Sequence, residues 1–158
     1  MTPTDPGELT LTLPTAADTH ALGMRIGAAA RPGDLVLLAG VLGAGKTALA
    51  QGVGAGLGVH RGVVSPTFVL ARVHTRGRLP FIHVDAYRLG GPDELDDLDL
   101  DTELPRSLTV VEWGQGLAER LAAEHLLVEL ERAADDVRTA RLSAAGPSWV
   151  LRLPLLTG

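Results

Sequence analysis

The chain is 158 residues long and carries a net charge of −5, and 46% of its residues are hydrophobic. This length predicts a single domain over residues 1–158. The negative net charge argues against a surface that binds a nucleic-acid backbone by itself. Because the chain has no cysteine, disulfides and thiolate metal sites are excluded. Because the first residues do not match a signal peptide and no apolar run approaches the roughly 20 residues of a membrane span, we expect a cytoplasmic protein without membrane contacts.

The first half of the chain alternates between strand and helix patterns. In chain order, the expected strands and helices cover residues 8–13, 16–30, 35–39 and 46–57. Residues 35–39 are apolar throughout, which is typical of a strand buried on both faces. Thr15 is a candidate N-cap for the first helix. The glycine cluster at residues 52–58 is expected to serve close packing and to end the second helix, not to bind a dinucleotide.

Strand patterns dominate the second half. Residues 67–74 and 79–85 flank a Thr-Arg-Gly-Arg turn and predict a β-hairpin, whose arginines are expected to cap it and not to hold RNA. Further strands are expected at residues 107–113, 125–131, 137–145 and 148–154, and short helices at residues 91–98 and 115–122. The predicted fold class is α/β, with a mixed, mostly parallel sheet flanked by helices and a β-rich C-terminal part.

Residues 40–47, Gly-Val-Leu-Gly-Ala-Gly-Lys-Thr, match the phosphate-binding pattern G-x-x-x-x-G-K-[ST] at every fixed position. In such a P-loop, glycines let backbone N–H groups turn toward phosphate oxygens, and the following helix adds its positive dipole end. Lys46 is the only lysine of the chain and is expected to reach the β- and γ-phosphates, while Thr47 offers its hydroxyl to Mg²⁺. We therefore expect a P-loop NTPase-like domain. Its nucleotide-binding residues in this stretch would be Gly40, Leu42, Gly43, Ala44, Gly45, Lys46, Thr47 and Ala48.

Two acids follow apolar strand patterns, Asp85 after residues 81–84 and Glu112 after residues 108–111. P-loop enzymes need a carboxylate near Mg²⁺ and a group that positions water, and such groups lie at the carboxyl ends of parallel strands. Lys46, Asp85 and Glu112 are therefore the predicted catalytic residues, and either acid could position the attacking water. His83 shares a strand face with Asp85 and is expected to be a packed histidine bonded to a neighbour.

Five stretches occur together: L-G-A-G-K-T (42–47), S-P-T-F (65–68), H-V-D-A-Y-R-L (83–89), E-L-D-D-L-D-L (94–100) and V-E-W (111–113). In order and spacing they resemble the bacterial TsaE family, also called YjeE, across most of the chain. This family of small P-loop ATPases is needed to make N6-threonylcarbamoyladenosine (t6A) in tRNAs that read ANN codons. The resemblance implies ATP and Mg²⁺ as cofactors and weak ATP hydrolysis by the isolated protein. It also implies the proteins TsaD and TsaB as partners, with tRNA contacted only indirectly through them.

The resemblance also implies roles for single residues. Thr47 and Glu112 become the Mg²⁺ ligands, Asp85 becomes the Walker-B-like acid near the γ-phosphate, and Arg138 lies on the nucleoside side, as do the residues around Thr19. The implied switch or partner-contacting residues are Ser65, Pro66, Thr67, Tyr87, Arg88 and Trp113. At Val41 and Ala48 the chain departs from the common family pattern, although neither position provides a required phosphate or metal contact.

Two other functions stay open from the sequence. A small-molecule P-loop kinase needs an arginine-bearing lid that closes over the phosphates, and the strand patterns after Glu112 argue against one. A nucleotide-gated binding module with incidental hydrolysis is the second alternative. It would be distinguished by whether ATP, ADP or neither favours association with the partner complex.

Overall fold

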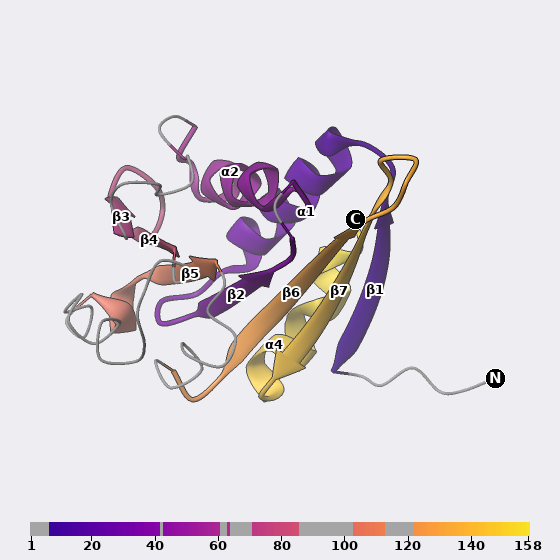
Figure 1. Cartoon of the computed structure of the whole chain (residues 1–158). Coiled ribbons are helices and arrows are strands. Elements are labelled where there is room, and N and C mark those ends of the chain that lie inside the picture. The colour runs from indigo at the N-terminus through magenta and orange to yellow at the C-terminus, as the bar shows by residue number, and fades with distance from the viewer. Residues whose placement is uncertain (1–6, 42, 61–62, 64–70, 86–102, 113–121) are drawn as a thin grey trace.

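The computed structural model describes residues 7–41, 43–60, 63, 71–85, 103–112 and 122–158. Within these residues the chain forms a seven-stranded sheet in the order β1-β7-β6-β2-β5-β4-β3 (Figure 1). The strands are β1 (Glu8–Leu13), β2 (Leu35–Ala39), β3 (Ala71–His74), β4 (Phe81–Asp85), β5 (Leu108–Glu112), β6 (His125–Arg132) and β7 (Arg138–Ala145). Each of these strands coincides with or lies within a segment that the sequence predicts to be a strand, except that β6 extends one residue further, to Arg132.

The sheet is parallel in its centre and antiparallel toward its edges. Strand β2 pairs in parallel with both β6 and β5, and β5 pairs in parallel with β4. The outer pairs β1–β7, β6–β7 and β3–β4 are antiparallel. This arrangement confirms the predicted mixed α/β fold. It also brings the carboxyl ends of β2, β5 and β4 together at one edge of the sheet.

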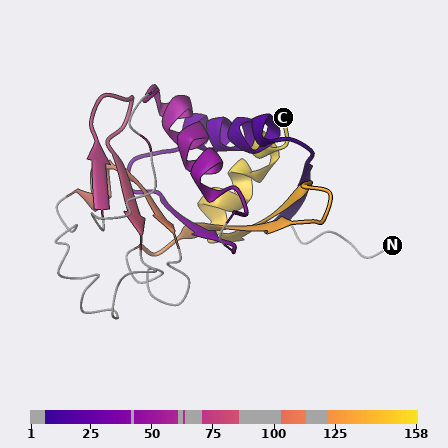
Figure 2. The same ribbon diagram turned by 45° about the horizontal axis from the view of Figure 1, so that its top comes forward.

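The helices α1 (Ala16–Ala29), α2 (Lys46–Leu57) and α4 (Pro147–Arg152) lie on the same side of the sheet (Figure 2). The main core fills the space between this face and the helices. A smaller cluster on the opposite face is formed by Leu35, Leu37, Ile82, Val84 and Val111. Both faces of β2 are therefore buried, as its apolar sequence predicts. None of the helices in the described ranges has the length and apolar character needed to cross a membrane.

Helix α1 is capped at both ends by side chains. Thr15 accepts a hydrogen bond from the Asp18 N–H while the Asp18 carboxylate accepts one from the Thr15 N–H, which is a capping box. At the other end, Arg78 donates from Nη2 to the Gly27 and Ala30 carbonyls at 2.9 and 3.0 Å. The predicted N-cap is confirmed. Arg78, expected to cap the hairpin, instead caps the end of α1.

Helices α1 and α2 approach each other at glycines. A Cβ atom on Gly52 would lie 2.1 Å from the His20 carbonyl oxygen, and one on Gly23 would lie 2.2 Å from the Leu49 carbonyl oxygen. Both distances exclude a side chain, so the glycines allow backbone-to-backbone contact. Gly58 then ends α2 with a φ of +93°. The cluster at residues 52–58 has the packing and helix-ending roles expected of it.

The prediction of a strand at residues 148–154 is wrong. The segment forms α4, followed by a short 3-10 turn, η4 (Leu153–Leu156). Pro147 occupies the start of α4, where its fixed φ and missing N–H favour a helix. The buried apolar side chains of the segment recur at helical spacing: Trp149, Leu153 and Leu156. The helices expected at residues 91–98 and 115–122 lie outside the described residues, apart from residue 122.

Candidate functional site

The loop that follows β2 has a backbone that only glycine adopts readily. Gly40, Gly43 and Gly45 have φ values of +151°, +83° and +106°. A Cβ on Gly40 would lie 2.8 Å from the Leu130 carbonyl oxygen, so this position also lacks room for a side chain. Gly45 is the N-cap of α2 and makes no side-chain cap, which leaves the helix N-terminus to other acceptors.

Lys46 is folded back into this loop and is only 7% exposed. Its Nζ donates to the Gly40 carbonyl at 2.6 Å and to the Val41 carbonyl at 3.4 Å. Burial lowers the pKa of the ammonium, and the negative charges of Glu112 and Asp85 oppose that shift. The site therefore has a buried cation held by loop carbonyls and within electrostatic reach of two acids.

The two acids are neighbours at the ends of adjacent strands. Asp85 on β4 is the register partner of Glu112 on β5, and Glu112 is also the partner of Leu38 on β2. In a parallel ladder such partners point to the same face, which here is the face covered by α2. Glu112 thus lies on the strand next to the loop-bearing strand, and Asp85 lies one strand further away.

Glu112 has a buried partner of its own. The Nε2 atom of His83 lies 2.8 Å from Glu112 Oε2, and the two residues are 0% and 4% exposed. This confirms the expectation that His83 is a packed histidine bonded to a neighbour. Asp85, in contrast, is only partly buried.

The β6–β7 hairpin brings two arginines to the loop. Arg132 and Arg138 are cross-strand partners. Arg138 donates from Nη2 to the Gly43 carbonyl at 3.5 Å, and Arg132 Nη1 lies 3.5 Å from the place of a Cβ on Gly43. Thr19, on the first turn of α1, also lies near the loop: its Cγ2 atom is 3.5 Å from the place of a Cβ on Gly45. The sequence alone identifies Arg138 and Thr19 but misses Arg132. Arg132 could have been found only by aligning the two predicted strands as a hairpin, which places it opposite Arg138.

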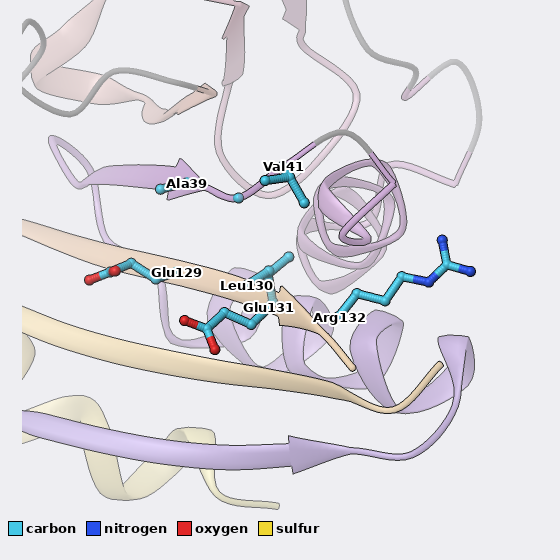
Figure 3. A pocket seen from close by; sticks show the side chains of 7 residues that line it. Ala39, Val41, Glu129, Leu130, Glu131 and Arg132 are labelled. Atoms are coloured by element: carbon cyan, nitrogen blue, oxygen red, sulfur yellow. The ribbon is translucent and has the colours of Figure 1, made fainter. Parts of the chain in front are cut away.

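A cavity of about 380 Å³ opens beside the start of the loop, between the ends of β2 and β6 (Figure 3). Its lining consists of Ala39, Gly40, Val41, Glu129, Leu130, Glu131 and Arg132. The carboxylates of Glu129 and Glu131 extend in one direction and the Arg132 guanidinium in the other, where Arg132 Nε donates to Asp136 Oδ1 at 2.8 Å. The Val41 side chain is 66% exposed at the rim.

The remaining predicted site residues divide into two groups. Ala44 is buried at the base of the loop, and Thr47 and Ala48 lie in the first turn of α2, with Thr47 exposed. The others lie outside the described residues: Leu42, Ser65, Pro66, Thr67, Tyr87, Arg88 and Trp113. In the described part of the chain, no three or more His, Asp or Glu side chains gather closely enough to hold a metal ion by themselves.

A glycine loop of this conformation, set between a buried parallel strand and a helix that begins Lys-Thr, places the chain among P-loop-type α/β proteins. The family model described as "Threonylcarbamoyl adenosine biosynthesis protein TsaE" matches residues 13–140. The chain belongs to this family.

Individual relatives agree with that membership. The tRNA threonylcarbamoyladenosine biosynthesis protein TsaE of Streptomyces coelicolor is 51% identical over 135 residues, covering 81% of this chain and 91% of that protein. The Bacillus subtilis protein of the same name is 40% identical over 130 residues, covering 82% and 81%. The crystal structure of Bacillus subtilis YdiB matches with a TM-score of 0.79 at 32% identity and covers 94% of this chain and 93% of that one.

Proposed function

We propose that this protein is an ATPase that binds ATP with Mg²⁺ and supports t6A formation in tRNA by acting on the TsaD–TsaB complex. The observation that carries the proposal is Lys46, which is buried in a glycine loop and electrostatically coupled to Glu112 and Asp85. The named relatives are tRNA threonylcarbamoyladenosine biosynthesis proteins, which is the reason for linking the activity to this modification.

The loop residues suit a triphosphate. The positive φ angles of Gly43 and Gly45 allow successive N–H groups to face one anion, and the N-terminus of α2 adds its dipole to the same place. The Lys46 ammonium, now bonded to the carbonyls of Gly40 and Val41, would exchange these acceptors for β- and γ-phosphate oxygens. Arg138, which contacts Gly43 from the β6–β7 hairpin, would lie beside the bound nucleotide.

The residues at the strand ends suit Mg²⁺. This ion is usually held in proteins by one or two carboxylates together with substrate phosphates, so a cluster of three acids is not needed. Thr47 and Glu112 would provide the protein ligands, since Glu112 lies on the strand next to the loop-bearing strand. With Mg²⁺ bound, charge on the phosphoryl oxygens is drawn toward the cation. Asp85, less buried and one strand further away, would orient the attacking water.

The fold of the C-terminal part favours an ATPase over a small-molecule kinase. Such kinases close a mobile lid over the phosphates. In residues 122–158, all of which the structure describes, β6 and β7 complete the sheet and α4 packs into the main core. This part of the chain is used for the scaffold and offers no lid.

The test is ATP hydrolysis, measured as phosphate release by the purified protein alone and with purified TsaD and TsaB, with and without tRNA. We expect slow turnover alone and a several-fold rise with the partners. The Glu112→Ala variant is the control and is expected to lose Mg²⁺-dependent turnover in both settings. Equal turnover with and without partners, together with phosphate transfer to a small-molecule acceptor, would support the kinase instead. Nucleotide-dependent association without faster turnover would support the binding module.

A further inference from the structure

A fully buried imidazole lies directly behind Glu112. His83 and Glu112 are on adjacent parallel strands, with His83 two register pairs deeper in the sheet, opposite Val110. The His83 Nε2 to Glu112 Oε2 distance of 2.8 Å is that of a good hydrogen bond. The hydrogen bond thus runs from β4 to the glutamate at the end of β5.

The chemistry of the pair fixes which group donates. An ionised carboxylate only accepts hydrogen bonds, so opposite the ionised form of Glu112 the donor is the Nε2–H group of His83. His83 Nδ1 has no hydrogen-bond partner among the described residues. The carboxylate oxygen of Glu112 that His83 contacts is Oε2.

The imidazole is itself held in place. Its ring stacks on the Phe81 ring with centroids 5.9 Å apart and an interplanar angle of 21°, and both rings are fully buried. A ring fixed by packing on one side and bonded to Glu112 on the other restricts the rotamers of the glutamate. Restricting them before a ligand arrives removes an entropy cost from binding.

We propose that His83 is a positioning residue that orients the Glu112 carboxylate for Mg²⁺. The inference rests on the proposed function, in which Glu112 binds the ion. Carboxylates that bind metals are commonly oriented by hydrogen bonds from a second layer of residues, and loss of such a partner typically lowers metal affinity about 10- to 100-fold. The buried pair fits this role because His83 is too deep in the sheet to meet the nucleotide itself.

The experiment measures Mg²⁺ affinity separately from nucleotide affinity. A fluorescent ADP analogue is first titrated into each variant without Mg²⁺, and Mg²⁺ is then titrated into the resulting complex. Mn²⁺ binding, followed by electron paramagnetic resonance, is the second readout. His83→Leu and His83→Asn remove the donor that reaches Glu112, whereas His83→Gln keeps an amide donor near the place of Nε2. We expect the first two to weaken Mg²⁺ binding about 10-fold or more, and His83→Gln to restore most of it, with Mg²⁺-free nucleotide affinity unchanged in all three.

Thr109→Val is the matched control. Thr109 is also fully buried on β5, its hydroxyl has no hydrogen-bond partner among the described residues, and its register partner is Ile82 on the opposite face of the sheet. This variant removes a buried polar group from β5, the strand that carries Glu112, but on the opposite face of the sheet. It is therefore expected to leave Mg²⁺ affinity unchanged. An equal loss in Thr109→Val and His83→Leu would overturn the proposal, because it would show a general effect on the sheet.

A measurement on the unaltered protein keeps the test independent of variant folding. With ¹⁵N-labelled histidine, addition of Mg²⁺ to the ADP complex should shift the His83 Nε2 resonance, and an unmoved resonance would count against the proposal. Glu112→Gln separates the two levels of inference. If it leaves Mg²⁺ affinity unchanged, the proposed metal role of Glu112 fails. If it weakens Mg²⁺ binding while the His83 variants do not, only the positioning role fails.

Discussion

Lys46 illustrates how narrow the chemical choice is at one position of the site. Elsewhere the chain meets its demands for positive charge with arginine, as at Arg78, whose guanidinium bonds the last carbonyls of α1. An arginine fork suits several fixed oxygens at once, whereas an ammonium is a compact charge on a flexible stem. The ammonium of Lys46 fits between loop carbonyls at 2.6 and 3.4 Å.

Replacing Lys46 with arginine should therefore impair nucleotide binding although the charge is kept. We expect Lys46→Arg to lose at least tenfold in ADP affinity, about 1.4 kcal/mol, because the wider guanidinium does not fit the space that the ammonium occupies. Isothermal titration calorimetry with ADP and Mg²⁺ measures the loss. Arg76→Lys, at an exposed position, is the control and should change nothing. Unchanged affinity in Lys46→Arg would mean that positive charge alone is sufficient.

At the scale of elements, local periodicity predicted most of the sheet because alternation and apolar runs are properties of single strands. The pairing of His83 with Glu112 was beyond such patterns, since it depends on β4 and β5 being neighbours, and strand order is a tertiary property. The C-terminal segment was missed for a different reason. Its alternation suggests a strand, yet Arg152, which would face solvent in that strand, is buried in α4.

The glycine contacts between α1 and α2 position the helix that carries Lys46, so we expect Gly52→Ala to be destabilising. Alanine gains about 1 kcal/mol of helix propensity over glycine, but its Cβ would lie 2.1 Å from the His20 carbonyl oxygen, and overpacking of this kind costs about 1–3 kcal/mol or more. We expect a net loss in the free energy of unfolding, measured by urea denaturation.

Ala28→Gly, at an exposed position of α1, is the control for helix propensity and should cost no more than about 1 kcal/mol. A Gly52→Ala protein that is more stable than the unaltered one would contradict the close helix contact.

At the scale of the whole molecule, a buried ion pair joins the C-terminal helix to the entry of β2. Arg152 of α4 donates to both carboxylate oxygens of Asp34, at 2.6 and 2.9 Å, and to the Ala29 carbonyl at the end of α1. Its guanidinium also lies 3.7 Å from the centre of the Trp149 ring. Asp34 lies just before β2, and the glycine loop lies just after β2. The ion pair therefore holds one end of this strand, and the candidate site lies at the other end.

Breaking this pair should lower stability without changing the distant site. Arg152→Met leaves the largely buried Asp34 carboxylate without its cation, which we expect to cost about 3–5 kcal/mol in the free energy of unfolding. In a double-mutant cycle with Asp34→Asn, the coupling energy between the two residues should be about 1–3 kcal/mol by urea denaturation, while the ADP affinity of the folded variants stays unchanged.

The control is Arg106→Met, which breaks an exposed pair with Glu103 and should cost less than about 1 kcal/mol. Equal losses in Arg152→Met and Arg106→Met would mean that burial adds nothing to the pair, and a weakened ADP affinity would mean that the anchor at one end of β2 controls the loop at the other.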